Sequence, residues 1–302
     1  MSHGSDSLKS IFFALGANSA IFVAKLGAAL MTGSGAMMAE AIHSLADSGN
    51  QVLLLVGLKQ AKRPPNPDYP LGFGKSIYFW SFIVALIMFS LGGMFSIYEG
   101  VHKLQHPEPL SSPWLAIGVL IFSIVAESVS MWGCLREVNK VREGRTLIQW
   151  FRETRQSELL VVFGEDFAAL LGLVFALGAV GLTMITGNPL YDATGSIVIG
   201  SLLILIAIFI GIEVKSLLIG QGVEPKLKQR MIASLEEEEK VAEILNLLTF
   251  QLGKDVMVAV KARMQGCESA DDMVTAINNC EKRFRKHFPE TLWLFFEPDN
   301  KK

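Results

Sequence analysis

Residues 39–47 read AEAIHSLAD and lie inside an otherwise apolar run that is long enough to cross a membrane. Glu40, His43 and Asp47 are three and four positions apart, so they share one face of an α-helix. An ionised side chain at the centre of a bilayer costs roughly 2.5 to 3.5 kcal/mol even on a lenient scale. Three titratable groups on one face therefore predict a compensating partner. A divalent cation that competes with protons suits this set of imidazole and carboxylate groups.

The composition favours a membrane protein over a large soluble domain. The chain has 302 residues, of which 51% are apolar, and its mean hydropathy is +0.40. The net charge of −2 gives no reason to expect nucleic acid as a partner. Cys134, Cys267 and Cys280 lack the spacing of a zinc ribbon or a disulfide framework, which indicates reduced, structural thiols.

Six apolar segments are each about 20 residues long, the length that a helix needs to cross a bilayer. The connections after the second and fourth segments are rich in Lys and Arg, whereas the opposite connections hold only Lys103. The positive-inside rule therefore places both termini and the two basic loops in the cytoplasm. No cleavable signal is expected before the first segment. The expected spans are Ile11–Met31, Ala36–Leu58, Ile77–Tyr98, Trp114–Leu135, Leu159–Ile185 and Ala193–Ile212.

The chain becomes polar and charged after Gly222, and its pattern then predicts a helix, two strands, a helix and a last strand. The expected fold class is therefore membrane α-helical. Six transmembrane helices form a transport domain over residues 1–220, and residues 221–302 form a small cytoplasmic α+β domain. The expected elements of this second domain are Glu224–Lys240, Ile244–Gln251, Val256–Met264, Ser269–His287 and Thr291–Phe296.

Further charges lie within the expected spans. Lys25 suggests an ion pair or a snorkelling side chain, and Glu127 suggests either a proton relay or a structural hydrogen bond. Glu165 and Asp166 are adjacent, and adjacent helical residues diverge by about 100°. At most one of the two can therefore point straight at the target of the His43 and Asp47 face, and the other must lie toward a neighbouring helix or be protonated.

The three groups His43, Asp47 and Asp166 suit Zn²⁺, and they also suit Mn²⁺, Fe²⁺, Co²⁺ or Cd²⁺. Because these ligands must lose protons to bind metal, such a site would take metal near neutral pH and release it on a more acidic side. The alternative is a buried His–carboxylate pair that only fixes helix packing. An intramembrane metallohydrolase is disfavoured, because no HExxH, GxSxG or Walker motif occurs. We therefore expect no enzymatic activity. The glycine-rich stretch GFGK, residues 72–75, indicates a loop turn.

Several motifs together resemble the cation diffusion facilitators. Ser34-Gly35 followed by AEAIHSLAD is similar to the signature of the family's second span. PLGFGK at residues 70–75 resembles the loop before span three, and GEDFAALLG at residues 164–172 resembles the span-five site. TGNPLYD at residues 186–192 and LQHPEP at residues 104–109 look closer to the mitochondrial zinc-transporter branch, which has bacterial relatives.

The resemblance implies a homodimer that exchanges divalent metal for protons by alternating access, with a ferredoxin-like C-terminal domain that helps dimerisation. It also implies a transport site on His43, Asp47 and Asp166. The family usually has His or Asp at the position of Val162, and we expect Glu165, water or Glu127 to replace that ligand. His287 is the only histidine of the C-terminal domain, so we expect dimerisation there without a regulatory metal cluster.

The sequence thus predicts a secondary transporter that exports Zn²⁺, or a related divalent cation, from the cytoplasm in exchange for protons. The expected metal ligands are His43, Asp47 and Asp166, with Glu165 as the accessory ligand; Glu40 and Glu127 are candidate proton carriers or outer-sphere partners. The expected partners are the metal ion as substrate, protons, the lipid bilayer of the bacterial inner membrane and a second copy, with no prosthetic group. The alternatives are a Mn²⁺, Fe²⁺ or Co²⁺ exporter, or a membrane metal sensor or scaffold that does not transport.

Overall fold

The computed structural model describes the backbone of residues 3–301 and the side chains of residues 18–301. It divides into two compact units. The first unit comprises the chain up to Val56, Trp80–Arg145 and Glu158–Glu213; the second comprises Gly57–Phe79, Thr146–Ser157 and the chain from Val214 onward.

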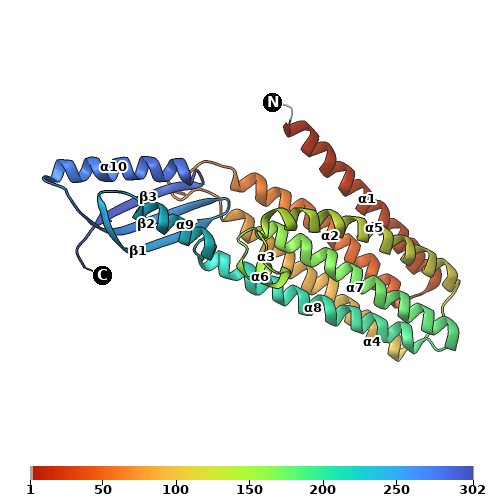
Figure 1. The fold of residues 1–302 in the computed structure, drawn as a ribbon. Helices are drawn as coiled ribbons and strands as arrows, with labels where there is room; N and C mark the ends of the chain where they lie inside the picture. The colour runs from red at the N-terminus through yellow and green to blue at the C-terminus, as the bar shows by residue number, and fades with distance from the viewer. Residues whose placement is uncertain (1–2, 302) are drawn as a thin grey trace. The chain divides into compact units, whose positions relative to one another are not determined.

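Long helices that run side by side build the first unit (Figure 1). The third of the expected spans is not a uniform α-helix, because seven of its residues form a π-helix, η1. The helices that contribute to the first unit are α1 (His3–Thr32), α2 (Gly35–Ala61), α3 (Ser76–Ile87), η1 (Met88–Met94), α4 (Phe95–Gln105), α5 (Pro113–Val141), α7 (Ser157–Thr186) and α8 (Leu190–Ile219).

Four helical stretches in the described part of the chain are long and apolar enough to cross a membrane: Ser76–Gln105, Pro113–Val141, Ser157–Thr186 and Leu190–Ile219. They confirm the last four expected spans. The first two remain predictions. The part of the first span before residue 18 lies outside the described side chains, and the apolar run of the second is interrupted by its own polar face.

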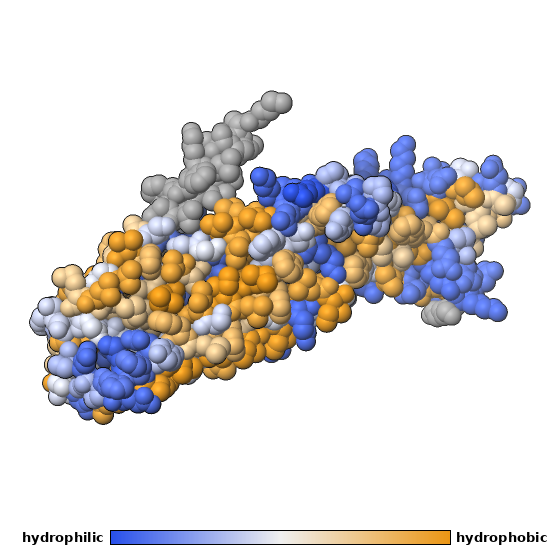
Figure 2. Space-filling model, turned by 180° about the vertical axis from the view of Figure 1, so that it is seen from behind, coloured by the Kyte–Doolittle hydropathy of each residue, from blue (hydrophilic) through white to orange (hydrophobic). Residues whose placement is uncertain are grey.

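Apolar side chains lie both inside and outside the helical unit. Met37, Leu120 and Leu173 belong to its buried cluster, whereas Val129 of α5 and Leu205 of α8 are exposed. Figure 2 shows hydrophobic residues over most of the visible face of these helices. A soluble bundle keeps its outer face polar, so this surface indicates contact with lipid.

The N-terminus of α2 is held by a carboxylate from another helix. The Ser34 hydroxyl donates to Oδ1 of Asp192 at 2.5 Å, and the Gly35 N–H donates to Oδ2 at 2.6 Å. The first N–H groups of a helix lack intrahelical partners. The Asp192 side chain of α8 supplies acceptors for them and therefore caps the N-terminus of α2. This contact joins two of the sequence motifs, Ser34-Gly35 and TGNPLYD, and anchors the helix that carries the polar face.

The second unit contains the small α+β domain. Its sheet has the order β1-β2-β3, with β1 and β2 antiparallel and β2 and β3 parallel. A parallel pair needs a crossover connection, which α10 supplies. The expected order of helix, two strands, helix and strand is confirmed. The elements are α9 (Pro225–Glu236), β1 (Val241–Leu252), β2 (Asp255–Met264), α10 (Ala270–His287) and β3 (Thr291–Pro298).

Local signals explain why α10 begins and ends where it does. The Ser269 hydroxyl accepts a hydrogen bond from the Asp272 N–H, and basic residues occupy the last turn.

A short helix, α6 (Leu147–Glu153), was not expected within the basic loop. The capping box formed by Thr146 and Gln149 accounts for its start.

The PLGFGK loop does more than turn the chain, because it packs on the β1–β2 hairpin within the second unit. A Cβ atom on Gly74 would collide with the carbonyl oxygen of Leu252, so the backbones can approach only with glycine at this position. The Tyr78 hydroxyl accepts a hydrogen bond from the Gly253 N–H at 3.1 Å. The start of α3 is therefore fixed to the hairpin turn.

Candidate functional site

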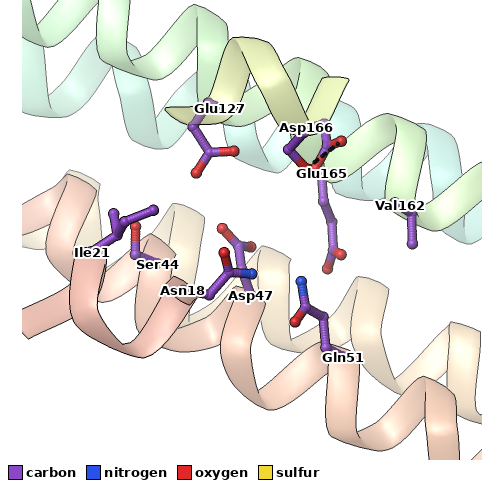
Figure 3. Close-up of a pocket in the computed structure, with 10 residues that line it drawn as sticks. Asn18, Ile21, Ser44, Asp47, Gln51, Glu127, Val162, Glu165 and Asp166 are labelled. Atoms are coloured by element: carbon purple, nitrogen blue, oxygen red, sulfur yellow. Dashed lines mark hydrogen bonds between the residues drawn. The ribbon is translucent and has the colours of Figure 1, made fainter. Parts of the chain in front are cut away.

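A cavity of about 50 Å³ lies among four helices of the first unit (Figure 3). This volume has room for an ion or a few water molecules. Its walls are mostly polar, although they lie within helices that are otherwise apolar. The lining residues are Asn18 and Ile21 of α1, Ser44, Asp47 and Gln51 of α2, Glu127 and Ser130 of α5, and Val162, Glu165 and Asp166 of α7.

Asp47 lines the cavity, whereas His43 does not line it and is buried next to Asp47. His43 Nδ1 lies 3.5 Å from Oδ1 of Asp47, one helical turn away, and the His43 side chain is only 1% exposed. Neither ring nitrogen of His43 has a hydrogen-bond partner among the described residues. A Cβ atom on Gly92 would lie 4.0 Å from Nδ1, so the imidazole faces η1. The π-helix thus lies beside the one histidine of the candidate site, and π-helical segments are frequent at functional sites.

Glu165 and Asp166 both line the cavity and diverge toward different helices, as adjacent helical positions require. Glu165 is 5% exposed, and its Oε1 accepts a hydrogen bond from Asn50 of α2 at 2.6 Å. Asp166 Oδ2 accepts one from the Ser130 hydroxyl of α5 at 3.1 Å. Each carboxylate therefore connects α7 to a neighbouring helix while facing the same small space.

Glu127 supplies a fourth carboxylate from α5, and in Figure 3 it points toward Asp47 across the cavity. Val162 also lines the cavity, where the resemblance leads us to expect a ligand. The apolar side chain at this position leaves Glu127 and Glu165 as the carboxylates available to replace the missing ligand.

Glu40 does not line the cavity. Its Oε2 forms an ion pair with Lys25 Nζ at 3.1 Å, and both side chains are fully buried. The ion pair expected as one interpretation of Lys25 is therefore confirmed, and complete burial rules out snorkelling. The sequence alone does not indicate that these two residues pair with each other. Three amides of the site were also not predicted: Asn18 and Gln51 line the cavity, and Asn50 donates a hydrogen bond to Glu165. Their helical spacing relative to the acidic residues was the available signal.

The cavity offers a metal ion mainly carboxylate oxygen atoms as ligands. Carboxylates from α2, α5 and α7 face a space of ionic size within the bundle, and they would repel one another if all were ionised and unneutralised. No three His, Cys, Asp or Glu side chains in the described part of the chain are close enough to hold one metal ion. The arrangement thus brings together candidate ligands without assembling a closed coordination shell.

Comparison with known proteins identifies the family. A family model described as the cation efflux transmembrane domain matches residues 11–219. The chain belongs to the cation diffusion facilitator family. This assignment confirms the resemblance found in the second and fifth expected spans and in the loop before the third.

Three relatives show how much of this chain and of each relative the similarity covers. The mitochondrial proton-coupled zinc antiporter SLC30A9 of Xenopus laevis is 37% identical over 247 residues, covering 81% of this chain and 44% of the relative. Metal tolerance protein C4 of Arabidopsis thaliana is 33% identical over 237 residues, covering 78% and 52%. Magnetosome protein MamB of Magnetospira sp. is 26% identical over 196 residues, covering 65% and 61%. The chain thus spans about half the length of the first two relatives.

Proposed function

We propose that this chain is a divalent metal cation/proton antiporter that exports Zn²⁺, or a related divalent cation, from the cytoplasm by alternating access. The observation that carries the proposal is the cavity, where Asp47, Glu127, Glu165 and Asp166 from three helices share about 50 Å³. Four carboxylates that share so small a cavity inside an apolar bundle need either a cation or protons to neutralise their charges. The name of the Xenopus laevis relative, a proton-coupled zinc antiporter, agrees with this proposal.

The exchange of metal for protons follows from the ligand chemistry. A carboxylate or imidazole binds metal only when it is deprotonated, so each bound ion displaces protons. Open to a near-neutral cytoplasm, the cavity would take up metal. Open to a more acidic side, the same groups would bind protons and release the ion. A difference in pH between the two sides can therefore drive the metal out.

We assign Asp47, Asp166 and His43 as ligands, with Glu165 as the accessory ligand. Binding then requires the carboxylates to converge from their present hydrogen bonds with Ser130 and Asn50. The imidazole would complete the site from behind Asp47, where its nitrogens have no other partner among the described residues. Glu127, across the cavity from Asp47, is the candidate to replace the ligand missing at Val162 or to carry a proton.

The proposal includes an arrangement in the membrane. Six spans would form a transport domain over residues 1–220, and residues 221–302 would form a ferredoxin-like domain that helps a homodimer to form without a regulatory metal cluster. Both termini would lie in the cytoplasm, as the positive-inside rule predicts from the basic loops, with the chain in a bacterial inner membrane. The four apolar helices and the three-stranded sheet support this arrangement.

Reconstitution into liposomes tests the proposed function. With an acidic lumen and a neutral exterior, the wild-type protein should drive Zn²⁺ into the lumen while the lumen loses acidity, and dissipating the pH gradient should stop the uptake. Competition by Mn²⁺, Fe²⁺ or Co²⁺ would rank the substrates. Zinc binding without any flux that depends on the pH gradient would contradict the antiporter and indicate a metal sensor or scaffold.

A further inference from the structure

The first unit contains a buried lysine that has no role in the proposed exchange of metal for protons. Lys25 of α1 is 0% exposed and ranks among the largest fully buried side chains of the described residues. A lysine inside a bilayer is costly and is normally paired or functional. Its surroundings therefore need a physical explanation.

The Lys25 ammonium bridges two groups on α2. It donates to Oε2 of Glu40 at 3.1 Å and to the Ser44 hydroxyl at 2.8 Å. On its other side, the Glu40 carboxylate packs directly on α7, because a Cβ atom on Gly172 would collide with Oε1 of Glu40. The ion pair is thus enclosed by three helices, and its two charges cancel in an apolar environment.

Ser44 connects this ion pair to the cavity. Its side chain is one of the cavity walls, and it also accepts the hydrogen bond from Lys25. The ammonium therefore lies one hydroxyl group away from the space enclosed by the four carboxylates. Asp47 lies three positions after Ser44 on α2 and lines the same cavity, so the ammonium is close to the candidate ligands. In a low-dielectric interior, such a charge changes the free energy of a nearby divalent cation.

We propose that the Lys25–Glu40 pair sets the affinity of the cavity for its cation, with Glu40 neutralising a positive charge that would otherwise oppose metal binding. With Glu40 in place, the pair adds no net charge beside the cavity. Without the Glu40 charge, the ammonium remains one hydroxyl from the site and repels the ion. Lys25 and Glu40 are positioning residues in this account, because neither touches the metal. The inference rests on the proposed function, since it takes the cavity as the binding site.

Zinc binding to purified full-length protein, measured by calorimetry at neutral pH, tests the inference. Glu40→Gln keeps the size of the side chain and removes its charge, so it should weaken zinc binding by about tenfold or more. The double variant Lys25→Met/Glu40→Gln removes both charges, and its affinity should return to within about threefold of the wild type. Lys25→Met alone should bind zinc at least as tightly as the wild type.

Glu137→Gln is the matched control, because it breaks a Lys–Glu pair on α5 whose partners are largely exposed and line no part of the cavity. It should leave zinc affinity unchanged. The inference is overturned if Glu40→Gln binds as tightly as the wild type, if the double variant stays as weak as Glu40→Gln, or if Lys25→Met binds more weakly. The failure of the proposed function looks different: Asp47→Asn would then bind zinc as tightly as the wild type. If Asp47→Asn lost zinc binding while Glu40→Gln kept the affinity of the wild type, the inference about the Lys25–Glu40 pair would be rejected and the proposed function would stand.

Discussion

Asp47→Asn and Asp166→Asn should each lower the zinc flux driven by a pH gradient by about 100-fold or more, toward that of empty liposomes. The two aspartates come from different helices, α2 and α7, and line the same cavity. Each substitution keeps the shape of the side chain while removing a negative charge and a proton-exchanging oxygen. The helices should therefore still pack, and the protein should still insert and purify as a single species.

Glu137→Gln again supplies the control for loss of a carboxylate, since this residue is exposed on α5. Its flux should equal that of the wild type. Normal zinc flux in either aspartate variant would refute the assignment of that residue as a ligand. Loss of flux together with loss of the folded protein would indicate a structural role, so the amount of protein recovered in the liposomes must be measured beside each flux.

His43→Ala should lower zinc flux by about tenfold or more and lower Mn²⁺ flux much less. Imidazole favours Zn²⁺, whereas carboxylates alone also suit Mn²⁺. Neither ring nitrogen of His43, beside Asp47, has a hydrogen-bond partner among the described residues, so its loss removes a nitrogen ligand while leaving the four carboxylates of the cavity in place. Parallel flux assays with the two metals provide the measurement.

The selectivity result separates the two interpretations of the His43–Asp47 contact. If His43 only fixes the packing of α2, the two metal fluxes should fall by the same factor. Thr183→Ala is a suitable control, because it truncates another buried polar side chain of the helical unit that lines no part of the cavity. It should leave the ratio of zinc to manganese flux unchanged.

The sequence predicts which faces of the helices carry the polar groups. The spacing of Glu40, His43 and Asp47 requires one face, and the Glu165-Asp166 pair is too costly in lipid to lie anywhere but inside the bundle. The turn and capping signals likewise predict the order of elements in the C-terminal domain. These features depend on residues that are near one another in the chain, where the period of the helix or strand determines the direction of each side chain.

Partners that are distant in the chain could not be predicted in the same way. The pairing of Lys25 with Glu40 depends on how α1 is rotated against α2, and the place of His43 behind the cavity depends on its packing near Gly92 of η1. Nothing in the spacing of these residues determines such rotations, because they result from how side chains of different helices fit together. The contact of Asn50 with Glu165 has the same origin.

X-ray absorption at the zinc edge of the zinc-loaded protein tests the central claim most directly, namely that carboxylates of α2 and α7 bind the transported ion together with His43. We predict a shell of only oxygen and nitrogen at about 2.0 to 2.2 Å, with the outer scattering of one imidazole. That shell should be lost when Asp47 and Asp166 are both replaced by Asn. Sulfur neighbours at about 2.3 Å, or an unchanged spectrum in the double variant, would contradict it.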